Sequence, residues 1–142
     1  MMMPHNQIKR VVSCFLLSGP KTRDQLRIVV FHRVATMPTF PNHWAACSGS
    51  MEENERPWQT SERELREETG VEAGKLKLVG VYSDPKRDPR GHVCSVAFMT
   101  RIDHATPLAG DDAAEAEWVA DAEEQLLAFD HDHILRDALQ LG

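Results

Sequence analysis

Residues 49–71 constrain this chain more than any other part of its sequence. Within these 23 residues, Gly49 is followed after five residues by Glu55, and seven further residues precede the run RELREETGV, which begins at Arg63. Seven residues stand at fixed offsets, namely Gly49, Glu55, Arg63, Glu64, Glu67, Glu68 and Gly70. Each match has a chance of roughly one in fifteen, so all seven arise by accident on the order of once in 10^8 start positions. This pattern therefore outweighs the others in the chain.

The second half of this stretch predicts a helix. Residues 58–69 contain neither Gly nor Pro and are rich in Arg, Glu, Leu and Gln, which favour helix. Pro57 suits the first helical position, and Gly70 suits the residue just past the end. On such a helix the small residues Thr60 and Ser61, together with Leu65, would face the protein interior.

Three glutamates of the predicted helix share one face. Glu64, Glu67 and Glu68 stand at positions i, i+3 and i+4, where like charges repel one another. A hard divalent cation would offset that repulsion, because Mg²⁺ prefers carboxylate oxygen, water and phosphate ligands. Arg63 can grip a carboxylate with a forked pair of hydrogen bonds, and Glu55 is its natural partner. Gly49 permits a tight loop, so its carbonyl is a further candidate ligand.

The alternative is an ordinary solvated face, which is what most charge runs at helical spacing represent. The fixed offsets to Gly49, Glu55, Arg63 and Gly70 favour the metal site instead. The stretch resembles the Nudix box, G-x5-E-x7-R-E-U-x-E-E-x-G-U with U apolar, at every defining position.

The resemblance implies a fold, a cofactor and a set of roles. It implies an α/β fold, namely a single-domain α/β/α sandwich with a mixed sheet and a loop–helix–loop metal site. It implies Mg²⁺ or Mn²⁺ bound by Glu64, Glu67 and Glu68 with help from the Gly49 carbonyl, and a structural role for Glu55 and Arg63. It also implies hydrolysis of a nucleoside diphosphate linked to another group.

Composition limits the other possibilities. A chain of 142 residues is most simply one domain, residues 1–142, with room for a substantial core. The net charge is −6, and residues 52–68 hold seven Glu and three Arg, which contribute −4. This local acidity argues for a cation and against a nucleic-acid partner. The three cysteines form no C-x-x-C motif, and neither a signal-peptide core nor a membrane span is present, so we expect a cytoplasmic protein.

The rest of the chain predicts strands and two more helices. Apolar runs predict strands at residues 11–17, 26–34, 43–47, 76–82, 93–102 and 117–119, and the first two strands are expected to form a hairpin. Residues 35–43, 84–92 and 105–114 read as loops. Asp121 and Asp130 are candidate caps for helices near 122–129 and 131–140.

The loop at residues 84–92 is the second stretch of functional interest. Lys86, Arg87 and Arg90 bring positive charge to an acidic protein, and arginine can grip phosphate in a forked geometry. The alternative is an exposed turn whose charges pair with one another. Residues 82–98, 110–118 and 127–135 resemble the region that follows the box in ADP-ribose pyrophosphatase-type Nudix proteins.

Four residues outside the box are candidates for weaker reasons. Trp44, just before the metal loop, is either a core residue or part of the substrate pocket. His92 has a pKa range suited to proton transfer but stands at a strand start, where packing roles are common. Glu115 and Glu117 are candidate bases from the far rim, or a solvated edge. His131 and His133 stand at i, i+2, which argues against a metal pair.

These observations predict an enzyme that hydrolyses a pyrophosphate bond. The catalytic candidates are Glu64, Glu67, Arg63 and Glu115, and the substrate-binding candidates are Arg87, Arg90, Trp44 and His92. The preferred substrate is ADP-ribose, giving AMP and ribose 5-phosphate. One alternative is a nucleoside triphosphate pyrophosphatase, and another is a non-catalytic module that senses a nucleotide. The resemblance also implies a possible homodimer, while the local acidity and the lack of a long apolar run predict no nucleic-acid and no membrane partner.

Overall fold

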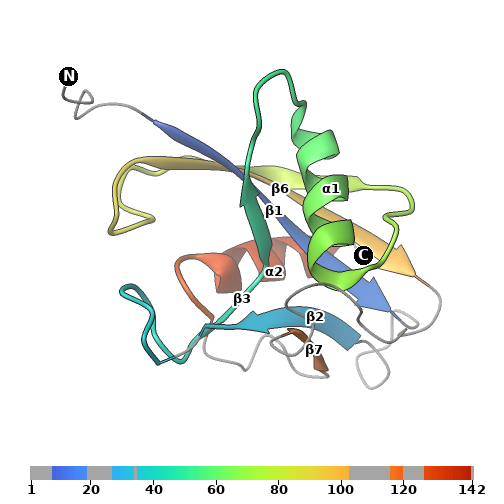
Figure 1. The fold of residues 1–142 in the computed structure, drawn as a ribbon, viewed down its shortest axis with the longest axis horizontal. Helices are drawn as coiled ribbons and strands as arrows, with labels where there is room; N and C mark the ends of the chain where they lie inside the picture. The colour runs from blue at the N-terminus through green and yellow to red at the C-terminus, as the bar shows by residue number, and fades with distance from the viewer. Residues whose placement is uncertain (1–7, 19–26, 34, 103–115, 120–126, 142) are drawn as a thin grey trace.

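A mixed β-sheet lies between two helices in the computed structural model, which describes residues 8–18, 27–33, 35–102, 116–119 and 127–141 (Figure 1). The helices are α1 (Pro57–Thr69) and α2 (His131–Leu141). The strands are β1 (Lys9–Ser18), β2 (Arg27–His32), β3 (Trp44–Ala45), β4 (Cys47–Ser50), β5 (Lys77–Tyr82), β6 (Val93–Ile102) and β7 (Ala116–Val119). Neither helix of the described residues is long and apolar enough to cross a membrane.

Strand β1 is the centre of the sheet. The strand order is β3-β2-β1-β6-β5, with β4 also paired to β1 and β7 to β2. β1 runs parallel to β6 along its whole length and antiparallel to β2 and β4. The predicted hairpin of β1 and β2 is confirmed, with Leu17 opposite Ile28. One parallel pair among antiparallel ones makes the sheet mixed, as expected.

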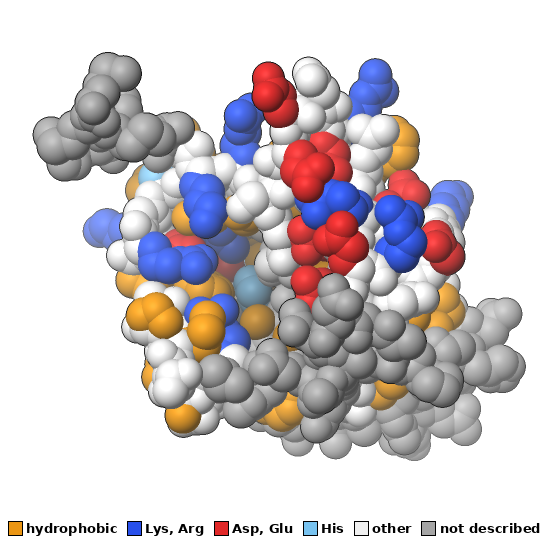
Figure 2. Space-filling model, in the orientation of Figure 1, with side chains coloured by type: hydrophobic (Ala, Val, Ile, Leu, Met, Phe, Trp, Pro, Cys, Tyr) orange, Lys and Arg blue, Asp and Glu red, His pale blue; other side chains and the backbone are white. Residues whose placement is uncertain are grey.

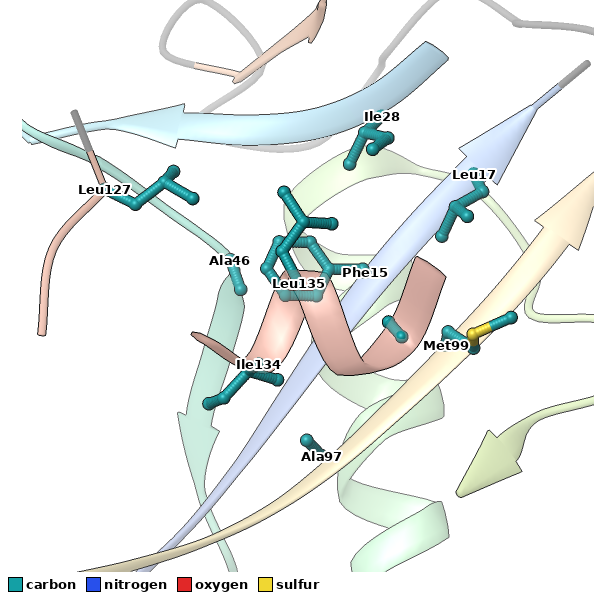
Figure 3. Packing of buried hydrophobic residues seen from close by; sticks show 10 residues of the cluster. Phe15, Leu17, Ile28, Ala46, Ala97, Met99, Leu127, Ile134 and Leu135 are labelled. Atoms are coloured by element: carbon teal, nitrogen blue, oxygen red, sulfur yellow. The ribbon is translucent and has the colours of Figure 1, made fainter. Parts of the chain in front are cut away.

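Side chains of β1 alternate between two cores. Phe15 and Leu17 pack on the α2 side with Ile134 and Leu135, as Figure 3 shows. Cys14 and Leu16 belong to the opposite cluster, which also contains Leu65 of α1. Because successive side chains of a strand point to opposite faces, an apolar run buried on both sides must have a layer on each face. The predicted α/β/α sandwich is therefore confirmed.

Helix α1 begins and ends where the sequence predicts. Pro57 is its first residue, and Gly70 follows it with a φ of 75°, which lets the Gly70 N–H donate to the Arg66 carbonyl at 2.9 Å. The residue before the helix is Arg56, whose side chain carries only hydrogen-bond donors and so cannot accept from the first N–H groups of the helix. The Gln59 side chain accepts a hydrogen bond from the Arg56 N–H at 2.9 Å. Thr60, Ser61 and Leu65 are buried, as predicted.

Three local predictions need correction. Residues 43–47 do not form one strand, because β3 ends at Ala45 and a new strand, β4, carries the chain through Gly49 to Ser50. The prediction of a helix near 122–129 is wrong for residues 127–129, the part that the structure describes. Leu127 forms a β-bridge to Trp44, and Phe129 has a φ of 55°, which a right-handed helix does not allow. The carboxylate of Asp130 pairs with Arg87 instead of capping α2. Residues 105–114 and 121–126 lie outside the described residues.

Candidate functional site

The three glutamates predicted to bind metal lie along one side of α1, from the contact of the helix with β4 out to the exposed surface. The side chain of Glu64 is 16% exposed and that of Glu67 is 52% exposed. Glu68, one position further on, lines the cavity described below. In Figure 2 acidic side chains gather on this part of the surface around a basic group. The helix therefore presents its carboxylates where the spacing predicts.

Arg63 connects the acidic groups around it. Its Nε and Nη2 donate to the two oxygens of Glu55 at 2.8 and 3.1 Å, which confirms the predicted forked pair. Its Nη1 donates to Glu64 at 2.7 Å and lies 3.4 Å from Glu67, and Nη2 also reaches the Ser50 carbonyl. The loop before α1, the helix itself and strand β4 are thus held together by one guanidinium.

Glu55 is fixed by four donors. Besides Arg63, its Oε1 accepts from the Thr60 hydroxyl at 2.6 Å and from the Glu52 N–H at 3.0 Å. These bonds, above all those from Arg63, lower the pKa of Glu55 to about 2 from an ordinary value of 4.5. Glu55 therefore acts as a charged structural link between the loop and the helix.

Replacing Glu55 by Gln should destabilise the fold at neutral pH and have progressively less effect in acid. A carboxylate with a lowered pKa stabilises the folded state above its unfolded pKa, and that contribution is lost as the pH falls from about 4.5 towards 2. Urea unfolding midpoints of both proteins between pH 7 and pH 3 measure this. The control is Glu53→Gln, an exposed position in the same loop with the same charge change. A Glu55→Gln deficit that stays constant with pH would contradict this role for the carboxylate.

Gly49 contacts Glu64 directly and is not part of a tight loop, contrary to the prediction. It lies within β4, opposite Val12 of β1. A Cβ at this position would come well inside 3.0 Å of Cγ, Cδ and Oε1 of Glu64. Burial against this strand is the main cause that raises the pKa of Glu64 above its ordinary value, although Arg63 opposes the shift. The glycine therefore provides the space in which the Glu64 carboxylate packs.

The donor set fits a hard divalent cation in its chemistry. Carboxylate oxygens from one helix face and a strand backbone at Gly49 are the ligands that Mg²⁺ or Mn²⁺ takes. Within the described residues, no three acidic, His or Cys side chains already converge on one point. Arg63 Nη1 contacts one oxygen of Glu64 and one oxygen of Glu67, so the other oxygen of each carboxylate is the one that would coordinate a cation.

A cavity of about 380 Å³ opens beside this face of α1. Figure 2 shows a hollow beside the acidic patch, with basic side chains around it and a histidine in its depth. Gly49 and the carboxylate of Glu68 lie at one end, and the basic residues of the lining are Lys9, Arg33, Arg87 and Arg90, with Asp88 among them. Phe31, Phe129 and His131 belong to its apolar and aromatic part. A cavity with a box carboxylate at one end and several cations around it suits an anionic ligand that brings a metal ion.

The two arginines predicted to bind substrate both line the cavity but differ in their partners. Arg87 donates to both oxygens of Asp130 at 2.8 and 2.6 Å, and its side chain is 5% exposed. Arg90 pairs with Asp88 and lies over the ring of Phe129 at 4.5 Å, while 47% of its side chain stays exposed. The geometry thus assigns Arg87 a structural pair and leaves Arg90 the more accessible cation.

Replacing Asp130 by Ala should lower the free energy of unfolding by about 2–3 kcal/mol, because it leaves the buried Arg87 guanidinium without its partner. The control is Asp132→Ala, whose pair with Arg136 at 3.6 Å is more than half exposed and should contribute about 0.5 kcal/mol or less. Chemical denaturation at pH 7 measures both. Equal effects of the two substitutions would contradict the structural role of the Arg87–Asp130 pair.

The structure does not bring every candidate to the cavity. Trp44 packs against the α2-side core, and His92 donates a hydrogen bond from Nε2 to the Ser83 carbonyl at 2.8 Å; neither is among the described residues that line the cavity. Glu115 lies outside the described residues, and so does the side chain of Glu117. The predicted catalytic and substrate roles of these four residues therefore remain predictions.

Sequence reasoning missed the aromatic part of the cavity. Phe129 contacts Phe40 and His131 at ring distances of 4.7 and 5.5 Å, and Arg33 also lies over its ring. His131 is buried in the cavity wall, whereas His133 is exposed and lies 3.3 Å from Asp137, so the two side chains have different surroundings. The sequence signal that could have indicated His131 is its place at the start of an apolar helix.

Known proteins resemble this chain along most of its length. The model of the NUDIX domain matches residues 7–140. The ADP-ribose pyrophosphatase of Methanocaldococcus jannaschii is 41% identical over 101 residues, which are 71% of this chain and 60% of that protein. The crystal structure of a mutT/nudix family protein from Listeria innocua superposes with a TM-score of 0.79 at 33% identity, covering 94% of this chain and 92% of that one.

One relative belongs to a different functional class. The ADPR responsive transcriptional repressor NtrR of Acinetobacter baylyi is 30% identical over 124 residues, which are 82% of this chain and 48% of the repressor. The chain thus spans about half to three-fifths of the lengths of the two curated relatives. Since one of them is a transcriptional repressor, the expected absence of a nucleic-acid partner is not confirmed.

Proposed function

This chain belongs to the NUDIX domain family, and from that membership we propose that it hydrolyses the pyrophosphate bond of ADP-ribose to AMP and ribose 5-phosphate with Mg²⁺ or Mn²⁺. The observation that carries the proposal is the cavity that joins Gly49 and Glu68 of the box to four basic side chains. The similarity of the chain to an ADP-ribose pyrophosphatase supports the choice of substrate.

The residues of the box have separable roles in this proposal. Glu64, Glu67 and Glu68, with the Gly49 carbonyl, would hold the cation, which when bound neutralises phosphate charge and lowers the pKa of water. Arg63 positions Glu64 through the 2.7 Å hydrogen bond and, with Glu55, ties the loop to the helix. Arg63 is therefore a positioning residue in this mechanism.

The remaining tasks fall to the cavity. Lys9, Arg33 and Arg90 raise the local concentration of the anionic substrate and hold its phosphates. A carboxylate takes the proton of the attacking water, and Glu67 is our candidate because it is half exposed beside the cation ligands. Glu115 is the alternative acceptor. Arg87 contributes by holding the cavity wall through Asp130.

Four wider proposals accompany this one. We propose that residues 1–142 form a single domain, that it acts in the cytoplasm, and that it forms a homodimer. We also propose that it binds no nucleic acid, which the net charge of −6 and the acidic face of α1 support.

A substrate panel tests the proposal. Purified protein is assayed with Mg²⁺ and ADP-ribose, a sugar nucleotide, a dinucleoside polyphosphate and a deoxynucleoside triphosphate. We expect the largest kcat/KM for ADP-ribose. Preference for the triphosphate would support the house-cleaning pyrophosphatase instead. Tight binding of ADP-ribose without turnover would support a nucleotide-sensing module. One relative, an ADPR responsive repressor, belongs to that class.

A further inference from the structure

His131 is held in the wall of the cavity by a backbone contact far away in sequence. It is the first residue of α2, is 4% exposed and lines the cavity with Phe129 and Arg87. The N–H of Ala46 donates to its Nδ1 at 3.1 Å across 85 residues of sequence. This bond fixes the orientation of the ring, because it joins the start of α2 to the junction of β3 and β4.

The same hydrogen bond decides which ring nitrogen carries the proton. A nitrogen that accepts a hydrogen bond must present its lone pair, so in the neutral ring the proton is on Nε2. Burial lowers the pKa of His131 to about 4; Asp130 opposes that shift, and Arg87 and Arg33 add to it. At neutral pH the side chain is therefore uncharged and has one N–H donor, at Nε2.

That donor has no partner in the described part of the chain. Among the described residues the His131 side chain hydrogen-bonds to Ala46, and that bond uses Nδ1. Nε2 is also not fully enclosed by protein, which agrees with the place of His131 in the cavity wall. In the unbound protein water can accept from this donor, and a ligand atom that accepts from it would take the place of that water.

We propose that Nε2–H of His131 donates a hydrogen bond to an uncharged acceptor of the nucleotide substrate, either a ring nitrogen of the base or a sugar oxygen. This inference rests on the proposed function of the cavity. A neutral donor suits an uncharged acceptor, whereas the phosphates have the guanidinium groups and Lys9 of the same cavity available. A ligand that lacks the acceptor would leave the donor unpaired, so the contact would select among substrates.

Two substitutions separate this role from a structural one. In His131→Asn an oxygen near the position of Nδ1 can still accept from Ala46, but the donor at Nε2 is lost. In His131→Gln a donor near the position of Nε2 is kept, but the acceptor for Ala46 is lost. We expect His131→Asn to weaken ADP-ribose binding about tenfold to a hundredfold with little change in Tm. We expect His131→Gln to lower Tm while its Kd stays within about threefold of the wild-type value.

Isothermal titration without divalent metal, using ADP-ribose, AMP, ribose 5-phosphate and inorganic pyrophosphate, gives these constants. A loss confined to AMP or to ribose 5-phosphate places the acceptor in that half of the substrate. An equal loss for pyrophosphate would overturn the proposal, because the acceptor would then be a phosphate oxygen. An unchanged Kd for His131→Asn with reduced binding by His131→Gln would also overturn it and leave His131 a purely structural residue.

A measurement on the wild-type protein removes any dependence on how the variants fold. In ¹⁵N-labelled protein the His131 signals should show the Nε2–H tautomer, and Nε2 should shift on saturation with ADP-ribose. An unchanged Nε2 signal at saturation would overturn the proposal. Turnover of ADP-ribose is assayed separately: turnover with an unchanged signal refutes only this inference, whereas a shifted signal without turnover refutes only the hydrolase.

Discussion

Replacing Glu68 by Gln is expected to lower kcat for ADP-ribose hydrolysis roughly 100- to 1,000-fold. Glu68 is the predicted cation ligand that lines the cavity together with Gly49. Gln has the same shape but no charge, so it would weaken a stabilisation of transition-state charge that is worth several kcal/mol. The variant should remain folded, because Gln fills the same space as Glu.

Steady-state kinetics over a series of Mg²⁺ concentrations measures this effect and separates it from misfolding. The control is Glu62→Gln, which removes the same charge from the same helix at a residue that does not line the cavity. It should keep kcat within about twofold, as is usual for substitutions away from a site. A Glu68→Gln protein with wild-type kcat and wild-type Mg²⁺ dependence would refute the assignment of Glu68 as a metal ligand.

Replacing Gly49 by Ala is expected to reduce kcat about a hundredfold in a protein that remains folded. The new methyl group would take the space of Cγ, Cδ and Oε1 of Glu64, so the carboxylate must move. Glu64 is a flexible side chain, and Ala is preferred over Gly in a strand, so the cost in stability is small. The carboxylate would leave the position where Arg63 holds it, and the cation would lose a ligand.

Gly74→Ala is the matched control for Gly49→Ala. The nearest atom to a Cβ at Gly74 is Oγ1 of Thr100 at 3.9 Å, an ordinary contact. We expect wild-type kcat for Gly74→Ala, with both variants unfolding within a few degrees of the wild-type Tm. If Gly49→Ala is fully active, Glu64 does not need its observed position, and its role as a ligand fails.

The local parts of the site were predictable from sequence because their causes are local. The bounds of α1 follow from Pro57 and Gly70. Arg63 and Glu55 are eight residues apart, and the turn before the helix brings their side chains together. Burial of Leu65 follows from helical periodicity. Each of these depends on residues near in sequence, where spacing alone determines which side chains can meet.

The parts that sequence reasoning missed depend on contacts between distant segments. Arg87 meets Asp130 across 43 residues, and Ala46 meets His131 across 85, so no spacing rule relates them. Strand β4, with the sequence CSGS, has little intrinsic preference for a strand and exists because it pairs with β1. The box therefore predicted the local arrangement of its charged side chains, whereas the residues that come together in the cavity wall depended on the fold.

The most direct test of the account is the fate of ADP-ribose with the wild-type protein. The protein is incubated with ADP-ribose in Mg²⁺ and, separately, in EDTA, and AMP and ribose 5-phosphate are quantified by chromatography. We expect equimolar AMP and ribose 5-phosphate in Mg²⁺ and none in EDTA. ADP-ribose recovered intact from Mg²⁺, or the same products at the same rate in EDTA, would contradict it.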